Sequence, residues 1–166
     1  MALYTIQNGV MPTTASFVAV TTGTTIKTLL QLKPFNVCKI VEWGISFDGS
    51  SADTPIEVEL LDTGTVFATV TTLADADVMK LDGAEGAVAS VAGLTLGTAA
   101  TGFTASAEGT ITTTKLFDVQ FIAPTNQYVK QFPLGREPKC IIGNAVRIRV
   151  KAATAVNAIT YMILEI

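Results

Sequence analysis

The sequence predicts an all-β fold in which two antiparallel sheets form a sandwich, and three observations support this prediction. Apolar residues recur at every second position far more often than at every third or fourth, which is the periodicity of a half-buried strand. Threonine, valine and glycine dominate the composition, and helix-favouring patterns are almost absent. The apolar runs are short and are separated by glycine, proline, asparagine and aspartate, so the chain is expected to turn often.

A single domain covering residues 1–166 is expected, because a chain of this length can bury enough apolar surface without disulfides or metal ions. Hydrophobic residues make up 49% of the chain, but none of their runs is long enough to cross a bilayer. The first residues show neither a basic leader nor a cleavage site. We therefore expect a soluble, non-secreted protein with no membrane partner.

The first element expected is an extended N-terminal arm of about residues 1–16, because Gly9 and Pro12 interrupt regular structure. The clearest strand lies further on, at 38–47. Its alternation predicts one face directed to the core and one directed outward. The core face is Val41, Trp43, Ile45 and Phe47, and the outer face is Glu42, Gly44 and Ser46.

Two later strands, 56–60 and 146–151, repeat the alternation, with apolar residues inward and charged residues outward. The outward residues are Glu57 and Glu59 on the first strand and Arg147, Arg149 and Lys151 on the second. Further strands are expected at 17–22, 26–32, 66–72, 110–122, 128–132 and 158–165.

The segment at about 81–109 is rich in alanine, glycine, serine and threonine, and it is expected to contribute little to the core. We interpret it as a long loop-rich insertion between strands. It is either ordered by contact with a neighbouring subunit or is a loose surface loop. Many short strands with one apolar face and short turns indicate an antiparallel β-sandwich of jelly-roll type, interrupted by this Ala/Gly/Thr-rich excursion.

No enzymatic activity is expected. The chain contains no histidine, so the commonest general base and every Ser-His or Cys-His nucleophile pair are missing. Paired carboxylates could act in glycoside hydrolysis. However, Glu57 and Glu59 are expected on a solvated strand face, and Asp75 and Asp77 have no aromatic neighbours that would hold a sugar.

No cofactor or metal site is predicted. Five loop aspartates could offer oxygen ligands to calcium: Asp48, Asp53, Asp75, Asp77 and Asp82. However, the 48–53 stretch lacks the alternation and terminal glutamate of an EF-hand loop. No glycine-rich stretch has the lysine or the following helix of a phosphate-binding loop. The net charge of -3 gives no long-range attraction for nucleic acid.

The two cysteines, Cys38 and Cys140, are far apart in the sequence, and each lies among strand-like apolar residues. Free cysteine is among the most buried residue types, so we expect two buried thiols. A disulfide is the alternative.

Charged residues on two features are the candidates for contacts with partners or with other copies of the chain. They are Glu57, Glu59, Arg147, Arg149 and Lys151 on the two strand faces, and Arg136 and Glu137 at the expected tip of a proline-bounded loop. The strand rows could pair within one chain, at about 0.2–1 kcal/mol for each exposed pair, or between subunits. The loop could be a specific contact or only a connection between strands.

Three parts of the chain resemble a known family. They are 42–49 together with 56–60, then 131–138, and then 145–150. These segments resemble jelly-roll decoration proteins, also called cement proteins, of tailed bacteriophage capsids. The resemblance covers most of the chain from Lys39 onward and rests on structural motifs, whereas 81–109 and the N-terminal arm match nothing in the family.

This resemblance implies a homotrimer on the exterior of the virion, bound to the major capsid protein and made in the host bacterial cytoplasm. A carbohydrate-binding jelly-roll module for host recognition is the first alternative, but Trp43 is expected in the core and the tyrosines are scattered. A cupin-like or glycosidase-like enzyme is the weakest alternative, because the histidines of a cupin metal site are missing.

Overall fold

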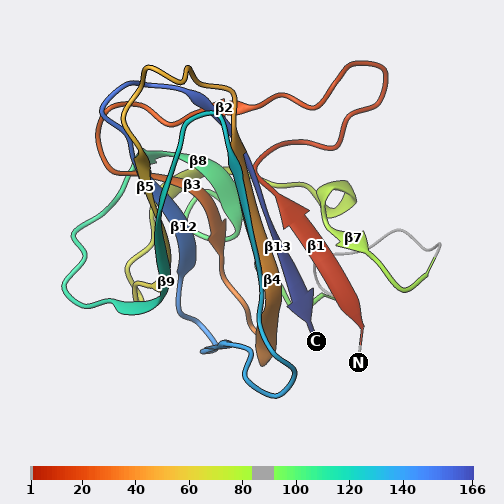
Figure 1. The fold of residues 1–166 in the computed structure, drawn as a ribbon. Coiled ribbons are helices and arrows are strands. Elements are labelled where there is room, and N and C mark those ends of the chain that lie inside the picture. Colours follow the sequence, from red (N-terminus) through yellow and green to blue (C-terminus); the bar gives the residue numbers. More distant parts are fainter. Residues whose placement is uncertain (1, 84–91) are drawn as a thin grey trace.

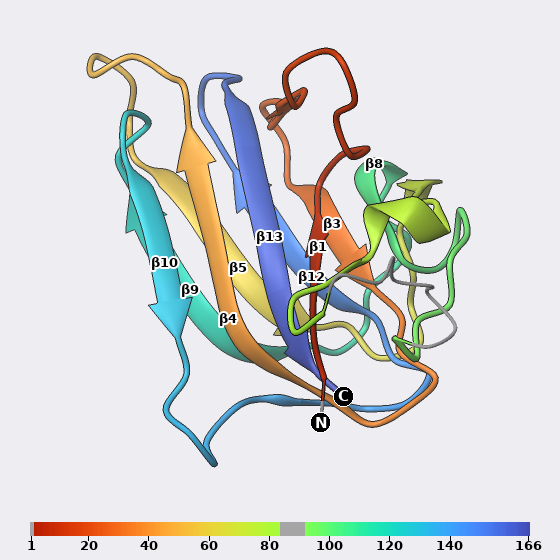
Figure 2. The same cartoon turned by 90° about the vertical axis from the view of Figure 1, so that its right-hand side faces the viewer.

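The computed structural model describes residues 2–83 and 92–166, and it is an antiparallel β-sandwich (Figures 1 and 2). Two sheets pack face to face, and every strand pair is antiparallel. The all-β prediction is therefore confirmed. Alternating apolar residues form these strands because one face of each sheet lies against the other sheet and excludes water.

The first sheet has the strand order β10-β4-β13-β1-β7, with β11 paired to β4 and β2 paired to β13. Its strands are β1 (Leu3–Gln7), β2 (Val20–Thr21), β4 (Cys38–Phe47), β7 (Met79–Lys80), β10 (Gln127–Gln131), β11 (Lys139–Cys140) and β13 (Asn157–Glu165). The second sheet has the order β6-β8-β3-β12-β5-β9. Its strands are β3 (Lys27–Leu32), β5 (Ile56–Asp62), β6 (Thr69–Thr72), β8 (Gly102–Ala107), β9 (Lys115–Ile122) and β12 (Val146–Lys151). A short 3-10 helix, η1, spans Asp75–Asp77.

The connections cross repeatedly from one sheet to the other, as in a jelly roll. The chain passes from β3 to β4 and back to β5, and later from β9 to β10, then to β12 and finally to β13, changing sheet at each step. Strands close in sequence therefore face each other across the core instead of pairing in one sheet. This wrapping limits the length of open sheet edge.

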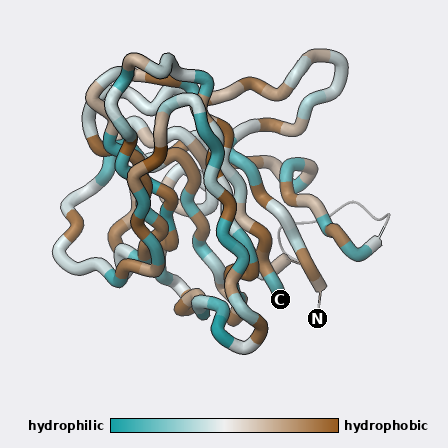
Figure 3. Tube along the Cα trace, viewed as in Figure 1, coloured by the Kyte–Doolittle hydropathy of each residue, from teal (hydrophilic) through white to brown (hydrophobic). Residues whose placement is uncertain are grey.

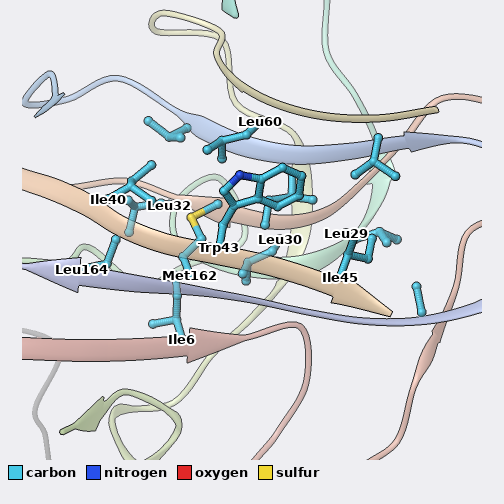
Figure 4. Close-up of a cluster of buried hydrophobic side chains, with 14 of the residues drawn as sticks. Ile6, Leu29, Leu30, Leu32, Ile40, Trp43, Ile45, Leu60, Met162 and Leu164 are labelled. Atoms are coloured by element: carbon cyan, nitrogen blue, oxygen red, sulfur yellow. The ribbon is translucent and has the colours of Figure 1, made fainter. Parts of the chain in front are cut away.

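The core lies between the sheets, around the fully buried Trp43 of β4 (Figure 4). The Trp43 ring packs against Tyr128 of β10, with 5.4 Å between ring centroids. Apolar residues of β12 and β5 cover it from the second sheet, as the alternation predicts. The inward residues include Ile56, Val58, Leu60, Val146, Ile148 and Val150.

One residue of β4 is not where simple alternation places it. Val41 is only partly buried, whereas Ile40 is fully buried. The pairing of β4 with β13 shifts at this point, because Glu42 is opposite Ile163 while Ile40 is opposite Leu164. Val41 is thus the extra residue of a β-bulge, which reverses the inward and outward positions on its two sides.

The N-terminal segment differs from the expected arm at its beginning. Leu3–Gln7 forms β1, which pairs along its length with β13, and Tyr4 and Ile6 are buried. Asn8 continues this attachment, since its side-chain amide donates to the Ala158 carbonyl and accepts from the Thr160 amide. Tyr4 and Ile6 lie in the core, so this part of the chain is a strand of the sheet. Only the segment after Asn8 runs outside the sheets (Figure 1).

The described parts of the 81–109 segment contribute more to the core than expected. This segment contains β8, which lies between β6 and β3 in the second sheet, and it buries Ala92 and Leu94. Small residues suit this position because the backbones of neighbouring strands approach closely there. Residues 84–91 of the segment lie outside the described residues.

Several strands are shorter than the patterns predict. The expected strand at 17–22 is reduced to Val20–Thr21, and the expected strands at 66–72 and 110–122 begin only at Thr69 and Lys115. In each case the missing residues lead up to the strand as a connection and pair with no strand among the described residues.

Candidate interaction surface

The charged rows of β5 and β12 lie next to each other in register on the outer face of the second sheet. Glu59 is opposite Arg149, and Glu57 is opposite Lys151. The Arg149 guanidinium donates from Nη2 to Glu59 Oε2 at 2.7 Å and from Nε at 3.1 Å. Of the two pairings that the sequence left open for Arg149, the structure contains the one within the chain.

Arg147 does not belong to the exposed row, contrary to the sequence-based expectation. Its side chain has an exposed fraction of 0%. The guanidinium donates to the carbonyl of Val66, to the carbonyl of Glu108 and to the Glu108 carboxylate at 3.2 Å. The connection before β6 and the end of β8 therefore cover this part of the sheet. Burial lowers the pKa of Arg147, and the nearby Glu108 partly offsets that shift.

Glu137 is also not the exposed loop tip that the sequence suggests. It is 9% exposed, and its carboxylate accepts the Gly135 amide at 3.0 Å and lies 4.0 Å from Lys39 Nζ. Hydrogen bonds from its own amide and from the Gly135 amide, together with Lys39, lower the pKa of Glu137. The carboxylate therefore holds the loop in shape from within, while Arg136 remains exposed.

The tip of this loop is apolar. The amide of Arg136 donates to the Pro133 carbonyl, and Gly135 has a φ of 80°, which closes a tight turn that other residues rarely adopt. This turn projects Leu134 outward, with 93% of its surface exposed. A leucine in that position has almost no contact with its own chain.

Further exposed apolar side chains lie at the same end of the sandwich, in the 33–37 and 132–145 connections. The Gly143 amide donates to the Pro34 carbonyl and joins the two connections. Both connections lie at the end that also holds the chain termini (Figures 1 and 2), and Figure 3 shows hydrophobic residues among these loops. We call this set the apolar end. Its members are Phe35, Val37, Leu134, Ile141 and Ile142, each at least 43% exposed.

Two exposed basic residues lie at the apolar end. Arg136 and Lys139 are exposed and form no salt bridge with the described residues. The loops at the opposite end carry the acidic Asp48 and Asp53. A chain with a net charge of -3 therefore presents local positive charge where its apolar loops project.

The outer face of the first sheet carries Tyr161, Glu42 and exposed apolar residues. Tyr161 of β13 lies across Gly44 of β4, where a side chain on Gly44 would collide with the ring. The tyrosine hydroxyl donates to the Glu42 carboxylate at 2.6 Å. Burial and this hydrogen bond raise the pKa of Tyr161 to about 12. Val129 and Ile159 are exposed on the same face.

The aspartates that the sequence offered as cation ligands serve as local hydrogen-bond acceptors. Asp48 accepts from the backbone and the side chain of Asn157, beside a surface hollow of about 390 Å³. Asp53 accepts the Ser50 amide, and Asp77 accepts the amides of Met11 and Ala74. Across the described ranges, no three acidic or cysteine side chains gather in a way that could hold a metal ion.

The apolar end was not among the sequence-based candidates, which were charged residues on two strand faces and at the tip of the proline-bounded loop. A usable indication was present, since 35–37 and 141–142 place large apolar residues beside Pro34 and Gly143, which are residue types that favour turns. Apolar residues in a turn have no core face to occupy, so they are candidates for contact with another molecule.

The part of the chain that the structure describes contains no helix with the length and hydropathy that a membrane span requires. Comparison with models of known protein families, with curated proteins and with solved structures yields no match for this chain.

Proposed function

We propose that this chain is a structural virion protein that decorates the outer surface of a bacteriophage capsid. In this proposal it binds the major capsid protein as a homotrimer and stabilises the shell by bridging neighbouring subunits. The observation that carries the proposal is the apolar end, where five large apolar side chains on loops are exposed to solvent. The motifs that resemble decoration proteins, at 42–49, 56–60, 131–138 and 145–150, support the same function.

The apolar end supports a binding role on energetic grounds. Burying a large apolar side chain contributes about 1.5–3 kcal/mol. Leu134, at 93% exposure, would gain nearly the full amount on contact with a partner. A soluble protein that leaves several such side chains together on one end retains an unfavourable surface unless another protein covers it.

Positive charge at the apolar end indicates the chemistry of the partner surface. Arg136 and Lys139 flank the exposed apolar residues and have no acidic partner among the described residues. A shell surface with an apolar groove bordered by carboxylates would complement them. Three such ends in one trimer would bind together, so even a modest contact in each subunit would give stable attachment.

The contacts of the polar and aromatic side chains favour a structural role over a sugar-binding role. Glu59, Glu108, Asp118 and Glu137 are held in ion pairs or hydrogen bonds that support the fold. The side chains most suited to binding a sugar are engaged elsewhere, since Trp43 is in the core and Tyr161 lies over Gly44. These features favour capsid decoration over carbohydrate recognition.

The test is co-sedimentation of the purified chain with undecorated capsids assembled from the major capsid protein that, on this proposal, the same phage genome encodes. We expect saturable binding and a higher temperature of capsid disruption. Leu134→Ser together with Ile142→Ser should weaken binding at least tenfold, because two contacts worth more than about 0.7 kcal/mol each are lost.

The matched control is Val10→Ser with Val18→Ser, which changes two exposed apolar residues in the loop before β2, at the opposite end of the sandwich. This control should bind like the unchanged protein. If the unchanged protein does not bind such capsids at any concentration, the proposed function is wrong. If both double variants bind equally well, the apolar end is not the contact.

A further inference from the structure

The two cysteines, distant in sequence, meet at one point of the fold. Cys38 is the first residue of β4, Cys140 is the last residue of β11, and the two are direct partners in the antiparallel ladder. Both are free thiols, and both are buried, at 1% and 2% exposure. Neighbouring pairs on the same ladder, Lys39 with Lys139, confirm the register.

The register brings the two thiols within bonding reach. Directly opposed residues in an antiparallel pair have Cα atoms about 4.5–5.5 Å apart and side chains on the same face. A disulfide requires a Cα separation of about 4.4–6.8 Å. No rearrangement of the sheet is therefore needed to bring the sulfur atoms together.

We propose that Cys38 and Cys140 are a disulfide-forming site that, when oxidised, fastens β11 to β4. In the reaction one S–S bond forms, two S–H bonds are lost, and two electrons and two protons pass to a small oxidant such as a diazene or a low-molecular-weight disulfide. Both cysteines belong to the same chain, so the product is an intramolecular cross-link. This inference does not depend on the proposed function.

The position of the pair determines what the cross-link would hold. β11 has only two residues, and it interrupts the 132–145 connection that carries Leu134, Ile141 and Ile142. A two-residue strand contributes few ladder hydrogen bonds, so β11 is a weak attachment for this connection. Oxidation would replace that weak attachment with a covalent one directly beside the apolar end.

The cross-link would also restrict the unfolded chain. It closes a loop of about 100 residues, which is long enough to remove much conformational entropy from the unfolded state. β1 and β13 lie outside that loop and stay attached to it, because β13 pairs with β4 and β1 pairs with β13. Oxidation should therefore stabilise the whole sandwich, including parts distant from β11.

Reaction of this pair should be slow in the folded protein. Both sulfur atoms are buried, and the hydrogen bond with Cys38, burial and nearby negative charge raise the pKa of Cys140. The thiolate is the reactive form, so oxidation should be faster at mildly alkaline pH and should require local opening of β11. A small neutral oxidant such as diamide suits these conditions.

The experiment treats the folded full-length chain with diamide, quenches remaining thiols by alkylation, and measures intact mass, peptide mapping and thermal unfolding. We expect loss of both free thiols, a monomeric product lighter by the two thiol hydrogens, and one peptide pair that links Cys38 to Cys140. The midpoint of unfolding should rise on the order of 10 °C, and a reductant should reverse it.

The single variants Cys38→Ser and Cys140→Ser are the controls, because neither can form the internal cross-link. Under the same treatment, neither variant should show the rise in unfolding temperature. The inference is overturned if the folded protein keeps both thiols after prolonged exposure. It is equally overturned if the products are disulfides between chains, or if the internal cross-link appears only in denaturant.

Discussion

At the scale of single residues, the ion pair between the buried Arg147 and the partly exposed Glu108 shows that Arg147 supports the fold and is not available for binding. Glu108 accepts the amide and the hydroxyl of Thr28, both at 2.6 Å, in addition to the Arg147 guanidinium. One carboxylate thus connects the end of β8 with β3 and β12. Arg147 is buried, so this carboxylate and two backbone carbonyls stabilise its positive charge in place of water.

We predict that Glu108→Ala lowers the free energy of unfolding by about 3–5 kcal/mol, because it leaves a buried arginine without its counter-charge. Urea unfolding followed by the fluorescence of Trp43, the sole tryptophan, measures this loss. Adding Arg147→Met should recover part of it, since the uncompensated charge is then removed. Asp82→Ala, in a solvent-exposed pair with Lys80, should cost less than about 1 kcal/mol. An equal effect of Glu108→Ala and Asp82→Ala would contradict the interpretation.

At the scale of elements, the bulge in β4 decides which residues enter the core. Cys38 and Ile40 face inward before the bulge, while Trp43, Ile45 and Phe47 face inward after it. Without the extra residue, the alternation would direct one of these two sets to solvent. Val41, at the change of register, is free to be partly exposed.

We predict that truncating Ile40 destabilises the protein more than truncating Val41, which is the reverse of what simple alternation along β4 would give. Ile40→Ala should cost about 2–5 kcal/mol of unfolding free energy, because it leaves a cavity in the core. Val41→Ala should cost less than about 1 kcal/mol. Urea unfolding monitored by circular dichroism compares them directly. A regular strand without the bulge would give the opposite order.

At the scale of the whole molecule, the charged row of β5 and β12 must be assigned to the fold or to assembly. The pairing of Arg149 with Glu59 is satisfied inside one chain, and Lys151 is opposite Glu57. These residues are only partly buried, so they remain accessible to another copy. A contact between subunits would depend on which position carries the positive charge and which carries the negative charge. An ion pair within one chain requires only that the two charges be opposite, so it would survive an exchange of the two residues.

A charge exchange separates these two roles. Arg149→Glu alone should lower stability and weaken the proposed trimer, because it collects acidic side chains on one face. Combining Arg149→Glu with Glu59→Arg should restore the internal pair and the stability of the chain. If the row contributes to self-association, the combined variant will still be defective in assembly by light scattering. Full recovery of both properties would assign the row to the fold alone.

The sequence was sufficient to predict the two-layered antiparallel fold, the inward faces of 56–60 and 146–151, the burial of Trp43 and the burial of both cysteines. All of these depend on local alternation and residue type, which act between neighbours in the chain. The burial of Arg147 and Glu137, the bulge at Val41 and the strand at Leu3–Gln7 depend on segments that are distant in sequence.

Local pattern by itself determined which residues could face a core, because the geometry of a strand imposes a period of two on its side chains. Only the tertiary structure decided which outward faces are covered, where the register shifts, that Cys38 meets Cys140, and that five apolar loop residues project together at one end. The physical reason is that burial is a property of packed surfaces. A side chain is buried by whatever the rest of the chain places over it.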